Sequence, residues 1–118
     1  MTDERRDNAD GVDNVLGALA DPTRRQLLDL LAAQGEATAT ALAERLPISR
    51  QAVVKHLAVL DAAKLAVGTR VGREVRYSLR PAALNATARW MAGLASEWDR
   101  RLAAVKRVAE AAERDSRE

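Results

Sequence analysis

Two short segments with helical periodicity are separated by only three residues, Pro47-Ile48-Ser49, and this spacing limits the fold more than any other feature. Thr38 is a candidate N-cap for the first segment, which ends at Pro47 because proline cannot continue a helix. Ser49 is the candidate N-cap of the second segment, which extends to about Ala63. Its predicted buried stripe, at i, i+4 and i+7, consists of Val53, Leu57 and Leu60. Two short helices joined in this way form a helix-turn-helix.

Two further helices are predicted before this motif. An apolar face at i, i+3, i+4 and i+7 begins at Val12 and ends at Leu19. Asp21-Pro22 then starts a second helix, because Asp can accept hydrogen bonds from free amides and Pro is tolerated at the first helical position. This helix is expected to end near Gln34, with Gly35 as its C-terminal cap and a buried side made of Leu27, Leu28, Leu30 and Leu31.

After Lys64 the apolar pattern changes from helical to extended. The segments 65–71 and 74–79 are rich in Val, Thr and Tyr, and they flank Gly72-Arg73. A glycine in the first central position suits a type II′ turn. The sequence therefore predicts a two-stranded β-hairpin.

From about Pro81 the sequence is helical again for about 30 residues, with apolar residues repeating every seven positions. The chain has only three aromatic residues, so its core is small, and this seam is longer than a small monomer needs. We interpret the surplus as a homodimer interface, with a ligand pocket near residues 90–98 as the alternative. The predicted interface residues are Val12, Leu16, Leu19, Met91, Leu94, Trp98, Leu102 and Val105.

The predicted fold is mainly α-helical with a two-stranded β-hairpin: a winged helix-turn-helix that dimerises through its N- and C-terminal helices. Four segments follow from it: a disordered N-terminal tail (1–11), a DNA-binding domain (12–80), a dimerisation helix (81–112) and a polar tail (113–118).

Basic residues are concentrated in the middle of the chain. Residues 45–80 contain eight Lys and Arg against two acidic residues, a local charge of +6, so the remainder carries −4 within the total of +2. A helix-turn-helix followed by a basic hairpin can place its second helix in the DNA major groove and its hairpin, or wing, along the backbone. Double-stranded DNA is therefore the expected partner.

The residues expected to read DNA lie opposite the buried stripe of the second helix of this motif. Arg can bind guanine, Gln can bind adenine and Val can contact a thymine methyl group. The predicted major-groove residues are Arg50, Gln51, Val54 and Lys55; the predicted phosphate contacts are Ser49 and His56; and the predicted wing contacts are Arg70, Arg73 and Arg76.

Each of these residues also has an ordinary structural interpretation. Arg50 and Lys55 can simply solvate a surface helix. The hairpin arginines can protect an edge strand from pairing with other chains. His56 can pack beside the buried stripe. DNA binding is favoured because all these features occur together.

Several other classes of protein are disfavoured. The chain has no cysteine and one histidine, so it offers neither a thiolate metal site nor a histidine cluster, and we expect no metal and no cofactor. It has no Gly-rich phosphate loop and no paired carboxylates in an identifiable pocket, so we expect no enzyme. No apolar run is long enough for a membrane span and no export signal is visible, so a cytoplasmic location is expected.

Several motifs, in this order, resemble the ArsR/SmtB transcriptional repressors over about residues 12–80. They are Asp21-Pro22-Thr23-Arg24, Leu42-Ala43-Glu44, Ile48-Ser49-Arg50-Gln51-Ala52-Val53, Lys55-His56-Leu57, Gly72-Arg73 and Tyr77-Ser78-Leu79. The C-terminal Arg89-Trp90-Met91 and Trp98-Asp99-Arg100-Arg101-Leu102 look like the metal-independent, SdpR-like branch.

The resemblance implies a homodimer that binds an inverted-repeat operator through Arg50, Gln51, Val54 and Lys55. Metal-sensing members carry a Cys-x-Cys pair where this chain has Thr38 and Thr40, and others use His and Asp on the last helix, which here has no His. The resemblance therefore implies a repressor without a Cys/His metal-sensing site.

Repression is expected rather than activation because little of the chain lies beyond the DNA-binding head and the dimerisation helix. The alternative function is a protein-interaction module in which the winged helix is only structural. Release from DNA is left open between a small-molecule inducer, a protein inducer and simple dilution.

Overall fold

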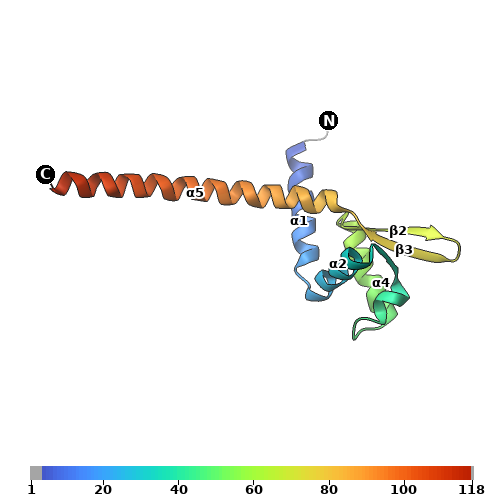
Figure 1. Cartoon of the computed structure of the whole chain (residues 1–118). Coiled ribbons are helices and arrows are strands. Elements are labelled where there is room, and N and C mark those ends of the chain that lie inside the picture. The colour runs from blue at the N-terminus through green and yellow to red at the C-terminus, as the bar shows by residue number, and fades with distance from the viewer. Residues whose placement is uncertain (1–3, 118) are drawn as a thin grey trace. The chain divides into compact units, whose positions relative to one another are not determined.

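The computed structural model describes the backbone of residues 4–117 and the side chains of residues 11–117. The chain divides into two units, Met1–Thr87 and Ala88–Glu118. The elements in Figure 1 are α1 (Glu4–Leu19), α2 (Pro22–Gln34), β1 (Glu36–Thr38), α3 (Ala39–Ala43), α4 (Arg50–Ala62), β2 (Ala66–Val71), β3 (Glu74–Leu79) and α5 (Pro81–Arg117). The prediction of a mainly helical winged helix-turn-helix is confirmed.

Three polar side chains start three of the helices, as predicted. The Asp21 carboxylate accepts hydrogen bonds from the backbone N–H groups of Thr23, at 2.7 Å, and Arg24, at 3.2 Å. Thr38 Oγ1 accepts from the N–H of Ala41, and Ser49 Oγ accepts from the N–H of Ala52, each at 3.1 Å. These bonds satisfy amides that have no partner within the first turn of a helix. They fix where α2, α3 and α4 begin.

The junction between α1 and α2 is also held by side-chain hydrogen bonds. Arg24 Nε donates to the carbonyl oxygen of Ala18 at 2.7 Å, and Arg25 donates to that of Leu19. Carbonyl groups in the last turn of a helix lack intrahelical partners, so these arginines stabilise the end of α1 from the start of α2. The Asp-Pro-Thr-Arg segment thus ends one helix and begins the next.

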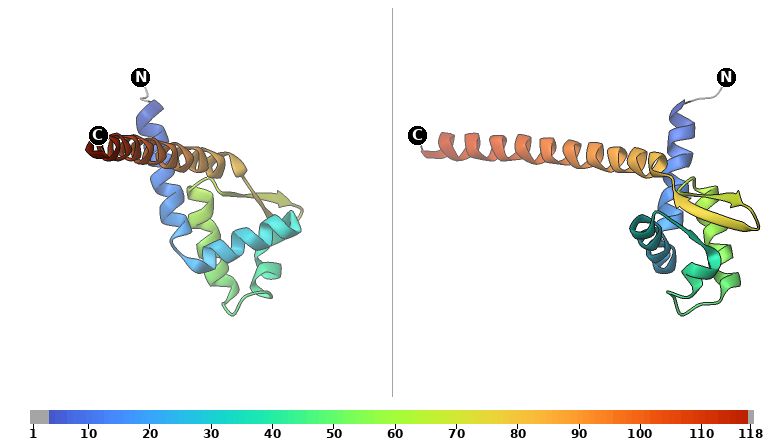
Figure 2. Two further views of the ribbon diagram at one scale, coloured as in Figure 1. Left: turned by 60° about the vertical axis from the view of Figure 1, so that its left-hand side comes forward. Right: turned by 45° about the vertical axis from the view of Figure 1, so that its right-hand side comes forward.

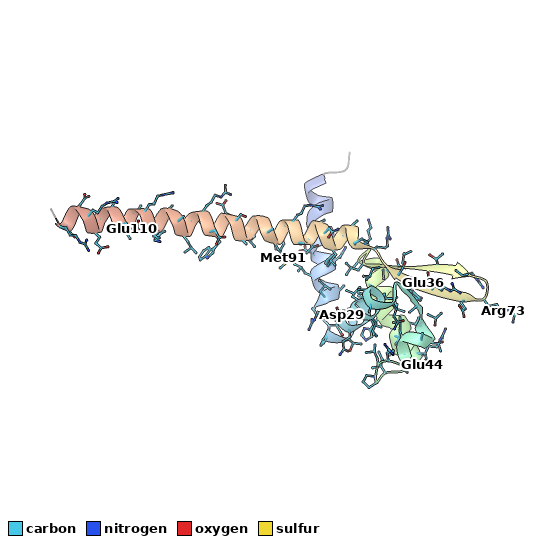
Figure 3. All side chains as sticks on the ribbon, viewed as in Figure 1. Asp29, Glu36, Glu44, Arg73, Met91 and Glu110 are labelled. Atoms are coloured by element: carbon cyan, nitrogen blue, oxygen red, sulfur yellow. The ribbon has the colours of Figure 1, made fainter. Side chains whose placement is uncertain are left out.

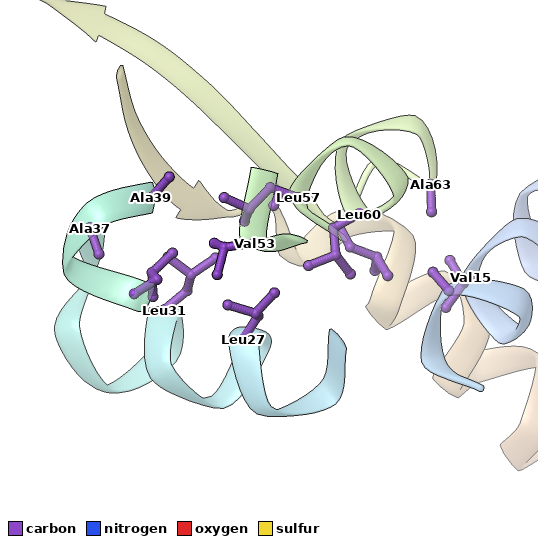
Figure 4. Close-up of a cluster of buried hydrophobic side chains, with 13 residues drawn as sticks. Val15, Leu27, Leu31, Ala37, Ala39, Val53, Leu57, Leu60 and Ala63 are labelled. Carbon is purple, nitrogen blue, oxygen red and sulfur yellow. The ribbon is translucent and has the colours of Figure 1, made fainter. Parts of the chain in front are cut away.

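One hydrophobic core lies between the helices and the sheet of the first unit (Figure 4). The predicted stripe of α4 is fully buried and meets Leu27 and Leu31 of α2 and Val15 of α1. Leu28 and Leu30, which were also predicted to be buried, are partly exposed and pack against this core. The core also contains Ala18, Ala37, Ala39, Leu42, Ala63, Leu65 and Ala66.

The sheet has three antiparallel strands in the order β1-β3-β2, so the prediction of a two-stranded hairpin missed β1. Only three residues long, β1 is too short to show an alternating pattern, and it forms because β3 offers it a free edge. Gly72 has φ of +64°, and Lys64 is the one non-glycine residue with positive φ in residues 4–117. With Arg73 at negative φ, the turn matches the predicted type II′ pattern.

Both terminal helices are longer than the sequence predicts. Residues 4–11, expected in a disordered tail, belong to α1, and residues 113–117, expected in the polar tail, belong to α5. Extending a helix costs far less free energy than starting one, so polar segments can continue helices that apolar segments begin. Of the predicted tails, residues 1–3 and 118 lie outside the described residues.

The second unit is the part of α5 that follows Thr87, and it contains no other element within residues 88–117. Its large apolar side chains are exposed, including Trp98 at 60% and Val105 at 67%. Across residues 4–117 no helix combines the length and apolar character that crossing a membrane requires.

Candidate nucleic-acid interface

One side of α4 is buried in the core, and the other side presents the predicted reading residues to solvent. Arg50, Gln51 and Lys55 are exposed, and Val54 is 37% exposed. The Ser49 cap fixes the start of the helix, and the Val53, Leu57 and Leu60 stripe fixes its rotation about its own axis. The first two turns of α4 therefore present two cations, one amide and one apolar side chain on a single face.

Arg50 has a partner on the neighbouring helix. Its Nε donates a hydrogen bond to Thr40 Oγ1 at 3.2 Å, which links the first turn of α4 to α3. Two of the three guanidinium nitrogens, Nη1 and Nη2, have no part in this bond. Arg50 thus lies at the surface of the helix-turn-helix with one end of its side chain anchored.

The two predicted phosphate residues differ in their surroundings. The exposed Ser49 hydroxyl accepts the capping bond from Ala52, and its own proton can still be donated to a phosphate oxygen. His56 is partly buried and acts electrostatically on the Asp21 carboxylate at the start of α2. Ser49 is therefore the more exposed of the two predicted phosphate residues.

The register of the hairpin separates the predicted wing arginines. Arg70 lies opposite Val75, on the face that carries Tyr77 and Leu79 onto the core. Alternation places Arg76 on the other face of the sheet. Arg73 occupies the turn at the tip of the hairpin, as Figure 3 shows. Beyond the core, the hairpin therefore presents arginines in three different directions.

The guanidinium of Arg76 is already paired with two carboxylates. It lies 3.2 Å from Glu36 of β1 and 3.3 Å from Glu74 of β3. The hydrogen bonds that Arg76 donates to Glu74 and, to a lesser extent, to Glu36 raise the pKa of Arg76 above its ordinary value. Arg76 lies on the central strand β3, so it does not protect a sheet edge. Of the arginines on strands, only Arg70 on the edge strand β2 fits the interpretation that a charged side chain protects an edge from pairing.

Two residues at this surface could not be found from the sequence. Glu36 reaches Arg76 only because β1 pairs with β3, and Thr40 reaches Arg50 only because α3 packs on α4 (Figure 2). No local pattern marks either residue. Their partners lie 40 and 10 positions away along the chain.

Thr38 and Thr40 occupy the positions where metal-sensing members of the resembled family carry the Cys-x-Cys pair, and both hydroxyl groups have hydrogen-bond partners within the chain. Thr38 caps α3, and Thr40 accepts the bond from Arg50. Among the described residues, no group of three His, Cys, Asp or Glu side chains lies close enough to hold a metal ion.

Comparison with known proteins gives consistent matches. Residues 19–68 match a family described as a helix-turn-helix domain. The transcriptional repressor SdpR of Bacillus subtilis (strain 168) is 36% identical over 88 residues, which cover 75% of this chain and 97% of SdpR.

Solved structures agree with these matches. An ArsR-like transcriptional regulator from Rhodococcus sp. RHA1 is 46% identical with a TM-score of 0.78, covering 86% of this chain and 94% of that one. A second solved structure is a homodimeric winged helix-turn-helix DNA-binding domain from Mycobacterium bovis, described as a possible ArsR-family regulator. It is 30% identical with a TM-score of 0.62, and the match covers 86% of this chain and 91% of the M. bovis chain. The capped helix-turn-helix, its hairpin and these similarities together show that the chain belongs to the ArsR/SmtB family of winged helix-turn-helix transcriptional regulators.

Proposed function

We propose that this protein is a homodimeric transcriptional repressor that binds an inverted-repeat operator in double-stranded DNA. The observation that carries the proposal is the exposed face of α4, with Arg50, Gln51, Val54 and Lys55, in the same unit as a hairpin bearing Arg70 and Arg73. The name of the SdpR relative supports repression.

The exposed face of α4 has the chemistry of direct base readout. Arg50 can donate two parallel hydrogen bonds to guanine O6 and N7, and Gln51 can pair with adenine N6 and N7. Val54 can contact a thymine methyl group, and Lys55 lies on the same face. The Ser49 hydroxyl and, on the wing, Arg70 and Arg73 would contact phosphates and set the register on the duplex.

A second copy of the chain is the proposed partner of α5. A single helix with an exposed apolar face has little stability by itself in water, so the residues after Thr87 require a surface to cover that face. The homodimer of the M. bovis domain supports a second copy. The proposed interface combines Val12, Leu16 and Leu19 of α1 with Met91, Leu94, Trp98, Leu102 and Val105 of α5.

Two-fold symmetry then determines the form of the operator. A closed dimer presents two identical reading helices related by a two-fold axis, so the bound sequence is an inverted repeat. We further propose that release from DNA does not use a thiolate metal site, because the chain contains no cysteine.

Selection of bound fragments from random DNA tests this function. We expect an enriched inverted repeat whose half-site centres are about one helical turn, roughly 34–36 Å, apart. Arg50→Ala and Lys55→Ala should each weaken binding to the selected sequence at fixed salt. If no sequence is enriched and the protein flows through a heparin column, the proposal is wrong and a protein-interaction module becomes the better explanation.

A further inference from the structure

Thr40 and Arg50 connect the two helices of the helix-turn-helix through a single side-chain hydrogen bond. The bond runs from Arg50 Nε to Thr40 Oγ1 at 3.2 Å, and both side chains are exposed. The capping of α3 does not use Thr40, since Thr38 is the N-cap. The hydroxyl of Thr40 is thus available for a role outside the core.

The bond determines which edge of the guanidinium remains free. Arg has five N–H donors in a rigid plane, and the bond to Thr40 uses the one on Nε. The donors on Nη1 and Nη2 can still form a parallel pair, and a parallel pair is what guanine O6 and N7 accept. Thr40 therefore leaves Arg50 competent for bidentate base recognition.

We propose that Thr40 is a positioning residue for DNA reading, which holds Arg50 in the orientation that contacts a base. This inference depends on the proposed function, because it concerns the same reading helix. A long arginine side chain loses rotamer freedom when it binds, and a side chain that is already held loses less. Thr40 thereby strengthens the contact of Arg50 without touching DNA.

The effect of Thr40 should appear in base discrimination more than in salt dependence. Thr40 is neutral and replaces no counterion, so its loss should leave the slope of log affinity against log salt unchanged. Its loss should instead weaken recognition at the base pair that Arg50 reads.

The test uses full-length protein and the inverted repeat recovered by selection, together with copies of that repeat changed at each base pair. Fluorescence anisotropy compares wild type with Thr40→Val, Thr40→Ser, Arg50→Ala and the Thr40→Val/Arg50→Ala double variant. Valine keeps the branched shape of threonine and removes the hydroxyl, whereas serine keeps the hydroxyl. Circular dichroism and thermal unfolding confirm that each variant is folded.

We expect Thr40→Val to weaken operator binding about two- to tenfold, the cost of immobilising one long side chain. Discrimination should fall at the same base pair that Arg50→Ala affects. Thr40→Ser should restore both quantities, and the double variant should bind no worse than Arg50→Ala alone.

Two results would overturn the inference. One is that wild type binds the repeat and Thr40→Val binds it with the same affinity and the same discrimination between bases. The other is a loss from Thr40→Val that persists in full when Arg50 is already alanine. If wild type binds no DNA at all, the proposed function fails and this inference fails with it. If wild type binds the repeat and either of the two results above is found, the inference fails alone, so the two failures are distinguishable.

Discussion

Arginine side chains in this protein differ in function according to what their guanidinium groups contact. Arg24 and Arg25 donate to the carbonyl groups at the end of α1, and Arg76 joins two strands through Glu36 and Glu74. Arg73 lies at the hairpin tip, and its side chain forms no ion pair with any described carboxylate. We therefore expect fewer arginines of the wing to contact DNA than the sequence alone suggests.

This difference predicts unequal effects for two hairpin arginines. Arg73→Ala should weaken binding to all DNA sequences by a similar factor and should reduce the salt slope by about 1, as expected for one lost phosphate contact. Arg76→Ala serves as the matched variant and should change the slope much less, because its charge is already compensated. DNA titrations between low and moderate salt measure the salt slopes of both variants. Equal slopes would contradict the prediction that Arg73 contacts a phosphate and Arg76 does not.

The carboxylate of Asp21 that caps α2 should make the free energy of unfolding depend on pH. Desolvation raises the pKa of its carboxyl, but the hydrogen bonds from Arg24 and Thr23 and the charges of Arg24 and His56 outweigh it, so the pKa lies below its ordinary value of 3.8. The stabilising contribution of the charged form is thus present above the unfolded pKa and is lost as pH falls through the folded value.

The control for Asp21 is Asp21→Asn, which keeps a capping oxygen and removes the titration. Thermal unfolding from about pH 6 to pH 2.5, a range chosen to span the ordinary carboxyl pKa, should show wild type losing more stability than the variant at the acidic end. A difference between the two that stays constant with pH would show that the carboxylate charge has no part in capping α2.

At the level of elements, the end of α4 contains one unfavourable backbone conformation. Lys64 has φ of 62°, and the N–H of Leu65 donates to the carbonyl oxygen of Leu60 at 2.9 Å, which closes the helix. Residues with a Cβ pay a steric cost in this left-handed conformation, whereas glycine does not.

We therefore expect Lys64→Gly to increase the free energy of unfolding by about 0.5–1 kcal/mol, a gain limited by the greater freedom of glycine in the unfolded chain. Lys64→Ala, which keeps the Cβ, should give no such gain. Chemical denaturation measures both variants. If alanine stabilises the protein as much as glycine does, the cause is the lysine side chain and not the backbone.

The elements that the sequence predicts well are those with local signals. Asp21, Thr38 and Ser49 each act on amides two or three residues away, so the starts of α2, α3 and α4 can be recognised without knowing the rest of the fold. Strand β1 has no such signal, since its three residues are extended only because β3 lies beside them. Its detection requires the tertiary arrangement.

At the level of the whole molecule, the exposed apolar face of α5 predicts that the dimer depends on that helix. Leu102→Glu should convert the protein largely to monomer, because the single symmetric interface loses one leucine from each copy, about 1.5–3 kcal/mol per copy, and receives a charge from each copy in its place. Operator affinity should fall as the dimer is lost. Sedimentation equilibrium measures the change.

Ser96→Glu provides the control for Leu102→Glu. It adds the same charge to the same helix at an exposed polar position outside the apolar seam, so the dimer should persist. A Leu102→Glu protein that remains dimeric at the concentration of wild type would place the interface elsewhere.

The sequence by itself determined the helix-turn-helix, the buried stripe of α4, the exposed face opposite it and the segregation of positive charge in residues 45–80. These features depend on caps, periodicity and composition, all of which act over a few residues. Only the tertiary structure decided that Arg76 is held by Glu36, that Arg50 is held by Thr40 and that the sheet has a third strand. Contacts of this kind join segments that are separate along the chain, so they exist only after the core has brought the elements together.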